Sequence, residues 1–268
     1  MKKASIVLVV FLIAVAVLIN KGIVDEAIKP SALKPADQNT EDAFTVLVEE
    51  GNVYFGDGTK YTHITESEIM LPNNTFVKTE EGYAQIILNN NSVISLDKFT
   101  SIQITSEINK TKISQLYGNT WHRIQELAKI GEYRVESNNT IAAVRGTIFS
   151  FSVDKEGNSE VEVIENEVEV TKGIKRGDKW EVLVKQVIAA KHRAQIKNDL
   201  EKKYDVIERK ETDEVSEWHQ INILKDQQIK DLNKVDMQRI KTILKTKPPI
   251  NKLEPQSQNQ PNNSQVLE

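Results

Sequence analysis

The residue types that could carry chemistry are present in this sequence, but they are not spaced for it. The four histidines, His63, His122, His192 and His219, are isolated. None has a second histidine or a carboxylate at the spacing that a metal-binding helix uses. The chain has no cysteine, which excludes thiolate nucleophiles, disulfides and cysteine-based metal centres. We therefore predict that the protein binds no metal and no cofactor.

Glycine and carboxylate patterns also favour structural roles. The segment Gly56-Asp57-Gly58-Thr59-Lys60 lacks the spacing and the helix start of a phosphate-binding loop, so it predicts a β-turn. Four glutamates alternate with valines and are expected on a solvated sheet face, namely Glu160, Glu162, Glu167 and Glu169. Paired acids on such a face lack the burial that separates their pKa values. With no Gly-x-Ser-x-Gly nucleophile setting either, the sequence predicts a protein that is not an enzyme.

The most individual segment is Thr140–Phe149, an apolar strand pattern interrupted by Arg145 and Gly146. A charge inside an apolar run needs a partner. One interpretation is structural: Arg145 is ion-paired or bonded to loop carbonyls, and Gly146 allows close backbone approach. The other interpretation makes Arg145 a ligand anchor. The binding site is otherwise unknown, and Arg145, Gly146 and Thr147 are expected to be structural first.

The elements that must position these residues are strands. From Phe44 to about residue 190, short apolar alternations are broken by Gly, Asn and Asp, which predicts an all-β domain, either a β-sandwich or a solenoid-like roll. The clearest expected hairpin pairs Glu160–Ile164 with Glu167–Thr171, with Glu165-Asn166 as its turn. One helix is expected over Trp121–Ala128, where apolar residues recur at helical spacing.

A helical C-terminal region is predicted over residues 191–247. Ala189–Tyr204 and Asp213–Lys245 are rich in Lys, Gln, Glu and Leu with few helix breakers. A broken apolar stripe in the second stretch favours packing against the chain's own domain, with a partner-binding helix as the alternative. Residues 248–268 are rich in Gln, Asn and Pro and are expected to be disordered.

The first twenty residues predict a membrane anchor. Lys2 and Lys3 precede an uncharged apolar run that ends near Ile19, close to the roughly 20 residues that span the hydrocarbon of a bilayer. We expect an uncleaved single-pass anchor with a cytoplasmic N-terminus, and a cleaved signal peptide is the alternative. Residues 21–43 would then form a linker, and the bulk of the chain would lie outside the cytoplasm. Charges of both signs are interspersed, so nucleic acid is not an expected partner.

The segment Val144–Phe149 resembles the Val-Arg-Gly-Thr-x-Phe signature of the FecR domain family. Thr79–Ile94 is similar to that family's Gly-x-Ala strand and the turn after it, with Asn91 in place of the usual glycine. Val161–Val170 resembles its closing hairpin, with Asn166 where glycine is common. The resemblance covers roughly residues 50–190 and implies an extracytoplasmic β domain.

Members of this family sense an outer-membrane receptor and control a sigma factor through a cytoplasmic N-terminal segment. Only three residues precede the apolar run here, so we do not expect the anti-sigma activity itself. The resemblance still implies a non-enzymatic module that binds a protein partner in envelope signalling or assembly. The alternative is a module that binds cell-wall or surface polysaccharide, or a structural envelope protein. Exposed aromatic residues in a row on one sheet face would favour the polysaccharide, and the candidates are Tyr54, Tyr61, Tyr83 and Tyr133.

Overall fold

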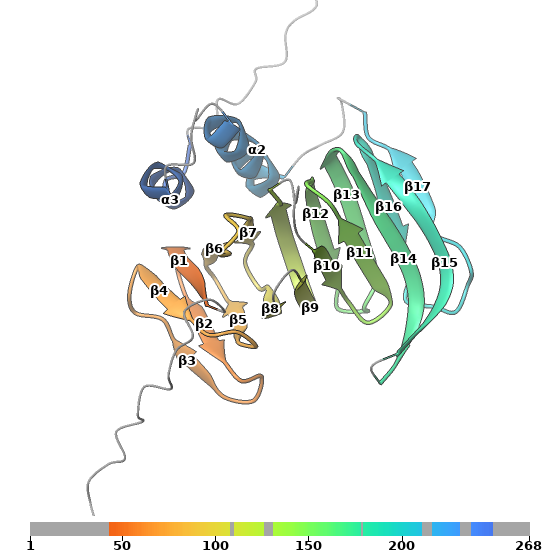
Figure 1. The fold of residues 1–268 in the computed structure, drawn as a ribbon, viewed down its shortest axis with the longest axis horizontal. Coiled ribbons are helices and arrows are strands. Elements are labelled where there is room, and N and C mark those ends of the chain that lie inside the picture. The colour runs from red at the N-terminus through yellow and green to blue at the C-terminus, as the bar shows by residue number, and fades with distance from the viewer. Residues whose placement is uncertain are drawn as a thin grey trace, which may run out of the picture. The chain divides into compact units, whose positions relative to one another are not determined.

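The computed structural model describes residues 43–107, 110–125, 131–177, 179–210, 216–230 and 237–248, which belong to one compact unit. This part of the chain is mainly β, with two helices near its C-terminal end, as the sequence predicts (Figure 1). The first strand begins at Phe44, the predicted start of the folded domain. The predicted anchor over residues 1–20, most of the linker and the C-terminal tail from residue 249 lie outside the described residues. Among the described helices, none is long and apolar enough to span a membrane.

The strands form two layers that share the long strand β9 (Lys110–Arg123). In spatial order, sheet A consists of β4 (Glu68–Leu71), β1 (Phe44–Glu50), β6 (Tyr83–Ile87), β7 (Val93–Leu96), the second half of β9, β12 (Ile148–Val153), β13 (Ser159–Glu165), β16 (His192–Ile196) and β17 (Asp205–Glu208). Sheet B consists of β3 (Tyr61–His63), β2 (Val53–Gly56), β5 (Phe76–Thr79), β8 (Ser101–Glu107), the first half of β9, β10 (Glu132–Glu136), β11 (Thr140–Val144), β14 (Glu167–Arg176) and β15 (Lys179–Ala189).

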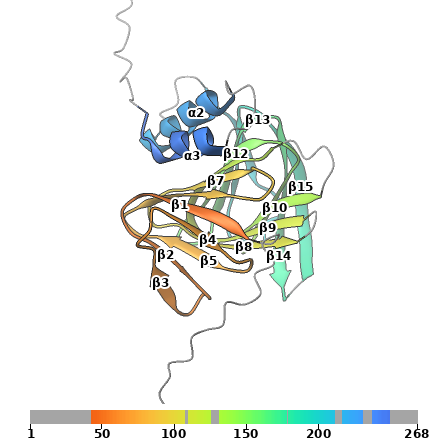
Figure 2. The same ribbon diagram turned by 60° about the vertical axis from the view of Figure 1, so that its left-hand side comes forward.

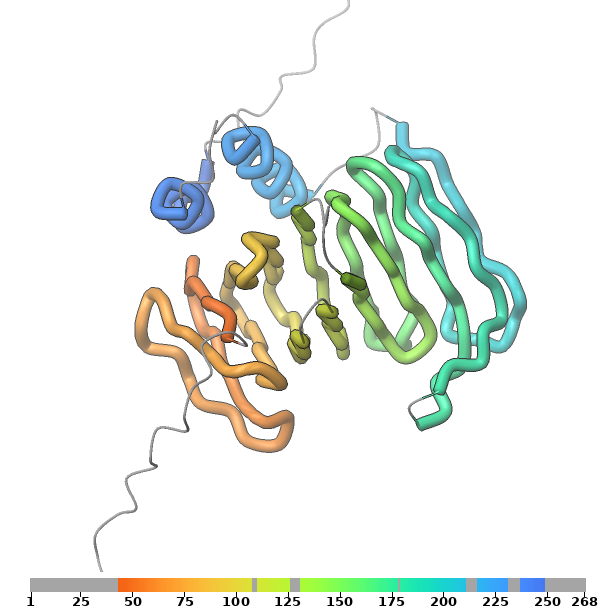
Figure 3. The backbone as a smooth tube through the Cα atoms, viewed as in Figure 1, coloured from red at the N-terminus to blue at the C-terminus, as the bar shows by residue number. Residues whose placement is uncertain are grey.

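The chain winds back and forth between these sheets as it advances along the molecule (Figure 3). At most corners where it changes sheet, one residue adopts a positive φ. These residues are Gly51, Asn74, Phe99, Gly118, Gly146, Asn166 and Lys191. The inward-facing residues of both sheets form one apolar core, which includes Val46 and Ile94 of sheet A and Val77 and Ile113 of sheet B. Burial of this core supplies the main driving force for folding.

Helices α2 (Glu217–Lys230) and α3 (Met237–Lys245) cover the outer face of sheet A (Figure 2). Ile229, Ile240 and Leu244 pack on Leu47 and Val93 of that sheet. The predicted packing of the C-terminal apolar stripe on its own domain is therefore confirmed. The central strands β6, β7 and β12 of sheet A are buried on both faces, which explains their nearly continuous apolar sequences.

Three expectations about elements are wrong. β13 and β14 exist where predicted, and Asn166 is left-handed with a φ of 61°. They do not pair as a hairpin, however, because β13 pairs with β12 and β16 in sheet A, whereas β14 pairs with β11 and β15 in sheet B. The turn is instead a corner between the two sheets. Valines face the same core from both strands, so alternation alone could not reveal the change of sheet.

In the other two cases, a helix was predicted where the structure has a strand. Trp121–Arg123 belongs to β9 rather than to a helix, and residues 126–130 lie outside the described part. Both faces of this end of β9 are covered, so its apolar residues do not show the alternation of a half-exposed strand. Ala189–Tyr204 contains β16 and a turn rather than a helix, and the sheet continues to β17, past the predicted domain end at residue 190. Pairing with β13 overrides the helix propensity of that stretch.

Candidate functional site

Gly146 forms the corner between β11 and β12, where the chain passes from sheet B to sheet A. Its φ is 73°, a left-handed conformation that glycine adopts without steric cost. The neighbouring corner, between β13 and β14, is held against it by Asn166, whose side-chain Nδ2 donates a 2.6 Å hydrogen bond to the Gly146 carbonyl. Gly146 therefore has a structural role.

Thr147 fastens the same two corners. Its side chain is buried, and its Oγ1 donates a 3.0 Å hydrogen bond to the Glu167 carbonyl. Its own carbonyl accepts a 3.0 Å bond from the Ile124 amide. These bonds satisfy polar groups that would otherwise be buried without partners. Thr147 thus helps to hold the two corners together.

Unlike Gly146 and Thr147, Arg145 makes no contact that holds the corner. It is exposed, and no hydrogen bond or salt bridge joins it to another residue in the described part of the chain. The expected ion pair or carbonyl contact is therefore not formed with any of these residues. Arg145 lies instead at a shallow hollow of about 630 Å³, lined also by Gly146, Asn166, Glu167 and Ala189. A guanidinium presented in this way can contact a carboxylate or another acceptor of a partner.

The four histidines lie in four different environments. His63 is exposed on β3, and the His192 ring contacts the Ala190 carbonyl. His219, on α2, contacts Glu162 and stacks edge-on against Trp121. His122 is fully buried between the sheets. Within the described ranges, no group of three or more His, Cys, Asp or Glu side chains is placed to hold a metal ion.

His122 belongs to a buried hydrogen-bond chain that the sequence analysis missed. Its Nε2 lies 2.7 Å from Thr120 Oγ1, its Nδ1 lies 2.8 Å from the Tyr133 hydroxyl, and its ring stacks on Phe149. Burial lowers the pKa of His122 to about 3 and raises that of Tyr133, so both groups are neutral at pH 7. His122 lies on β9 opposite Ile94 of β7 and Phe149 of β12. The sequence did not reveal this buried position, because Trp121–Ala128 was predicted to be a helix. These hydrogen bonds satisfy polar groups inside the core between the two sheets.

The glutamates on β13 and β14 are not uniformly solvated. Glu167 is exposed as predicted, but Glu162 is buried under α2, where its Oε1 lies 2.6 Å from Arg209. The solvated-face prediction is therefore wrong for Glu162, because the sequence does not show that a helix covers this part of the sheet.

Helix α2 is fixed to sheet A by buried charges. Asp226 accepts a 2.7 Å hydrogen bond from Trp121 Nε1 and lies 3.2 Å from Arg123. Burial raises the pKa of Asp226, and Arg123 opposes this shift. One residue earlier, Lys225 Nζ lies 2.7 Å from Glu49 Oε1. These contacts form a docking interface, and beside the Lys225–Glu49 pair it leaves a small pocket of about 10 Å³ that is lined also by Tyr83 and Trp218.

The predicted turn at Gly56–Lys60 is confirmed. Gly58 has a φ of 95°, and the Asp57 carboxylate accepts 2.8 Å hydrogen bonds from the amides of Thr59 and Lys60. These backbone bonds, that of Lys60 first, lower the pKa of Asp57 to about 2. The loop joins the paired strands β2 and β3 and is not arranged as a phosphate cradle.

Taken together, these features define a mainly β domain whose motif forms a rigid corner with an exposed arginine. Residues 74–169 match the model of a protein family described as FecR protein. The resemblance drawn from the sequence motifs is confirmed over these residues. No curated protein matches the chain significantly.

Two solved structures are similar to this chain, and both are described as a "putative anti-sigma factor" from Parabacteroides distasonis. The first is 13% identical, covers 50% of this chain and has a TM-score of 0.41. The second is 12% identical, covers 56% of this chain and has a TM-score of 0.42. The chain spans 59% of the first structure and 73% of the second.

Proposed function

We propose that this protein is a non-enzymatic recognition module, tethered to the cell membrane by residues 1–20, that binds a protein partner outside the cytoplasm in envelope signalling or assembly. The FecR match over residues 74–169 supports a signalling-related module. The observation that carries the proposal is the exposure of Arg145. Gly146 and Thr147 make hydrogen bonds that hold the corner, whereas Arg145 lies at the hollow that Glu167 also lines.

The partner expected at this hollow presents a carboxylate or a backbone carbonyl to Arg145. A planar guanidinium bonds such acceptors through two parallel N–H groups. Exposed arginines are also enriched among the residues that dominate protein interfaces. The nearby Glu167 lets the hollow select a partner with a hydrogen-bond donor next to its acceptor, which adds specificity to the contact.

Charge reversal at Arg145 tests this proposal. Full-length protein with Arg145→Glu is compared with the original chain by crosslinking in intact membranes, followed by quantitative recovery of specific partners. We expect recovery of the partner to fall about tenfold or more, since loss of an anchoring contact costs at least 1.4 kcal/mol. Urea unfolding should be unchanged, because the Arg145 side chain is exposed.

Arg176→Glu is the matched control. Arg176 is also an exposed arginine on sheet B, and its side chain pairs with Glu181 at the end of the β14–β15 hairpin. It should leave partner recovery unchanged. Equal recovery with Arg145→Glu and with the original chain would refute the role of Arg145. Failure to recover any specific protein with the original chain would refute the proposed function.

A further inference from the structure

The outer face of the N-terminal half of sheet B gathers aromatic side chains from separate strands. The strand register places Tyr54 opposite His63 on one side and Lys78 on the other. Lys78 lies opposite Ser101, which in turn lies opposite Tyr117. The intervening residues Val53, Val77 and Ile102 face the core, so Tyr54, Lys78 and Tyr117 point outward, with the small, buried Ser101 between the last two. We call Tyr54, Tyr61, His63, Lys78, Phe99 and Tyr117 the aromatic face.

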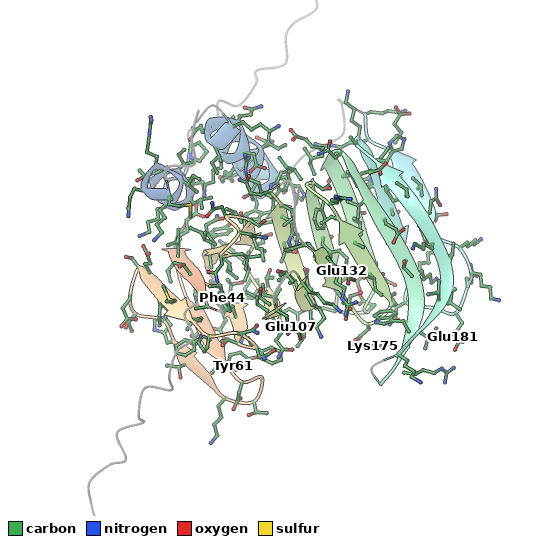
Figure 4. The ribbon with its side chains drawn as sticks, in the orientation of Figure 1. Phe44, Tyr61, Glu107, Glu132, Lys175 and Glu181 are labelled. Carbon is green, nitrogen blue, oxygen red and sulfur yellow. The ribbon has the colours of Figure 1, made fainter. Side chains whose placement is uncertain are left out.

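Contacts within the aromatic face hold its rings in place. Lys78 Nζ lies 5.7 Å from the ring centroids of both Tyr54 and Tyr61, and the Tyr54 and His63 rings are 5.2 Å apart. Glu80 completes the arrangement, since it lies 2.9 Å from Lys78 Nζ and accepts a 3.3 Å bond from the Tyr54 hydroxyl. Tyr61 projects from the edge of this sheet in Figure 4. A preorganised surface of this kind loses little side-chain entropy when it binds a ligand.

Phe99 is the most unusual residue of this face. Its φ is 52°, in the left-handed region that a bulky side chain rarely adopts, and its side chain is 57% exposed. Glycine would adopt this backbone conformation without strain. The Phe99 ring, in contrast, is too exposed to contribute much to the stability of the core. Such strain clusters at binding sites, where a particular side chain is needed in spite of its cost. Phe99 and Tyr117 line a hollow of about 490 Å³, together with Asn52, Lys78, Glu80 and Glu81.

We propose that the aromatic face binds a neutral polysaccharide, with Phe99 and Tyr117 as stacking platforms. A sugar ring has C–H faces that pack on aromatic rings, and its hydroxyl rim both donates and accepts hydrogen bonds. The hollow offers both kinds of contact, since two exposed rings stand beside the carboxylates of Glu80 and Glu81 and the amide of Asn52. Its volume falls in the range of small-ligand pockets, roughly 300–1,000 Å³.

The charges of the face select against other ligands. Lys78 is engaged by Glu80 and by two tyrosine rings, so it offers no free cation to an acidic segment or a phosphate. Glu81 adds a negative charge to the same hollow. An anionic ligand is therefore disfavoured, whereas a neutral polymer with many hydroxyl groups suits these partners. This surface is separate from the Arg145 hollow and does not depend on the function proposed above.

The test uses the full chain in detergent micelles with defined neutral polysaccharides: laminarin, xylan, dextran and hydroxyethyl cellulose in native affinity gels, and pelleting with insoluble chitin. We expect saturable retardation or pelleting with at least one polymer. Phe99→Gly and Tyr117→Ala should each weaken the apparent dissociation constant by about tenfold. Phe99→Gly should also leave the melting temperature unchanged or raise it, because it removes the left-handed strain.

Trp180→Ala is the control. Trp180 is a partly exposed aromatic residue on β15 that stacks with Lys175, as Tyr54 does with Lys78. It should leave polysaccharide binding within about twofold of the original chain. The proposal is overturned if no polymer binds more than an unrelated protein does, or if Phe99→Gly and Tyr117→Ala bind as the original does. A photo-crosslinker at Tyr117 that captures a protein in a Phe99-dependent manner, without polysaccharide binding, would assign the face to a protein instead.

Discussion

At the scale of single residues, the corners between the sheets show how the sequence directs the winding of the chain. Asn166 occupies one of them in the left-handed conformation that asparagine tolerates better than most residues. It also does what glycine cannot, since its amide bonds the Gly146 carbonyl of the next corner at 2.6 Å. The asparagine therefore contributes both a permitted backbone conformation and a link between corners.

Substitutions at Asn166 separate these two contributions. Asn166→Gly keeps the conformation and loses the hydrogen bond, so it should lower the free energy of unfolding by about 1 kcal/mol. Asn166→Ala loses the bond and also places alanine, which tolerates a left-handed backbone less well than asparagine does, at a φ of 61°, so it should cost about 2–3 kcal/mol. Urea unfolding followed by circular dichroism measures both. Equal destabilisation by glycine and alanine would show that the backbone conformation carries no cost here.

The buried His122 predicts a pH dependence of stability. Its pKa is about 3 in the folded protein and near the ordinary value of about 6.5 when unfolded, because burial disfavours the imidazolium. The unfolded chain thus binds more protons in acid. The stabilisation is complete above the unfolded pKa and is lost as the pH falls from about 6.5 toward 3.

We expect His122 to add a slope of about 1.4 kcal/mol per pH unit to the loss of stability between about pH 6 and pH 4. His122→Gln keeps polar contacts available to Thr120 and Tyr133 but does not titrate in this range. The slope of its unfolding free energy should be shallower by this amount, whatever its stability at pH 7. Parallel slopes for the two proteins would show that His122 is already protonated, or solvated, in the folded state.

At the scale of elements, the strands were predictable but their partners were not. β1, β6 and β7 follow from short apolar runs between turn residues. The left-handed Asn91 marks the turn between the paired strands β6 and β7, and the left-handed Asn166 marks a corner between the sheets. Alternating valines show which residues face the core. The same alternation is expected, however, whether the next strand pairs with the first in one sheet or lies across the core in the other sheet. The sequence showed that Arg145 and Gly146 interrupt an apolar strand pattern, but it could not show that Gly146 forms a corner between the sheets, that Glu162 lies under a helix or that Arg145 lies at an open hollow.

The attachment of α2 to sheet A is an element-scale feature that can be tested at one ion pair. The Lys225 side chain is only 2% exposed, and its Nζ contacts Glu49 at 2.7 Å and the Leu244 carbonyl at 2.9 Å. Removing one member of a buried pair leaves the other charge uncompensated, at a cost of about 3–5 kcal/mol. Lys225→Met should therefore destabilise the protein by about this amount and increase amide exchange in α2 and α3.

The double variant Lys225→Met with Glu49→Gln provides the control. It removes both charges, so it should recover a large part of the lost stability, and the coupling is read from a double-mutant cycle. Glu49 also accepts a bond from Gln85, which Glu49→Gln can still satisfy through its carbonyl oxygen. A double variant as unstable as the sum of the two single ones would mean that the pair is not coupled in the folded protein.

At the scale of the whole molecule, the roll offers separate surfaces for separate partners. The helices occupy the outer face of sheet A, whereas the outer face of sheet B carries the aromatic face and the corner of the motif carries Arg145. The core between the sheets and the apolar clusters under α2 and α3 are built from residues other than Arg145, Phe99 and Tyr117. Substitutions at the Arg145 hollow or on the aromatic face should therefore leave the fold intact. Binding effects there can be interpreted without a correction for unfolding.

The proposed tether is the remaining whole-molecule feature, and it decides where these surfaces are displayed. An uncleaved anchor predicts that the chain stays in the membrane fraction after carbonate extraction and that its mature N-terminus begins at Met1 or Lys2. Val9→Asp with Leu12→Asp places two charges in the apolar run, at about 2.5–3.5 kcal/mol each, and should release the protein from the membrane. The urea midpoint of the β unit should not change, since its core contains none of these residues. A mature N-terminus after Asn20 would instead identify a cleaved signal peptide and a released protein, and partner capture would then have to be sought in the medium rather than in membranes.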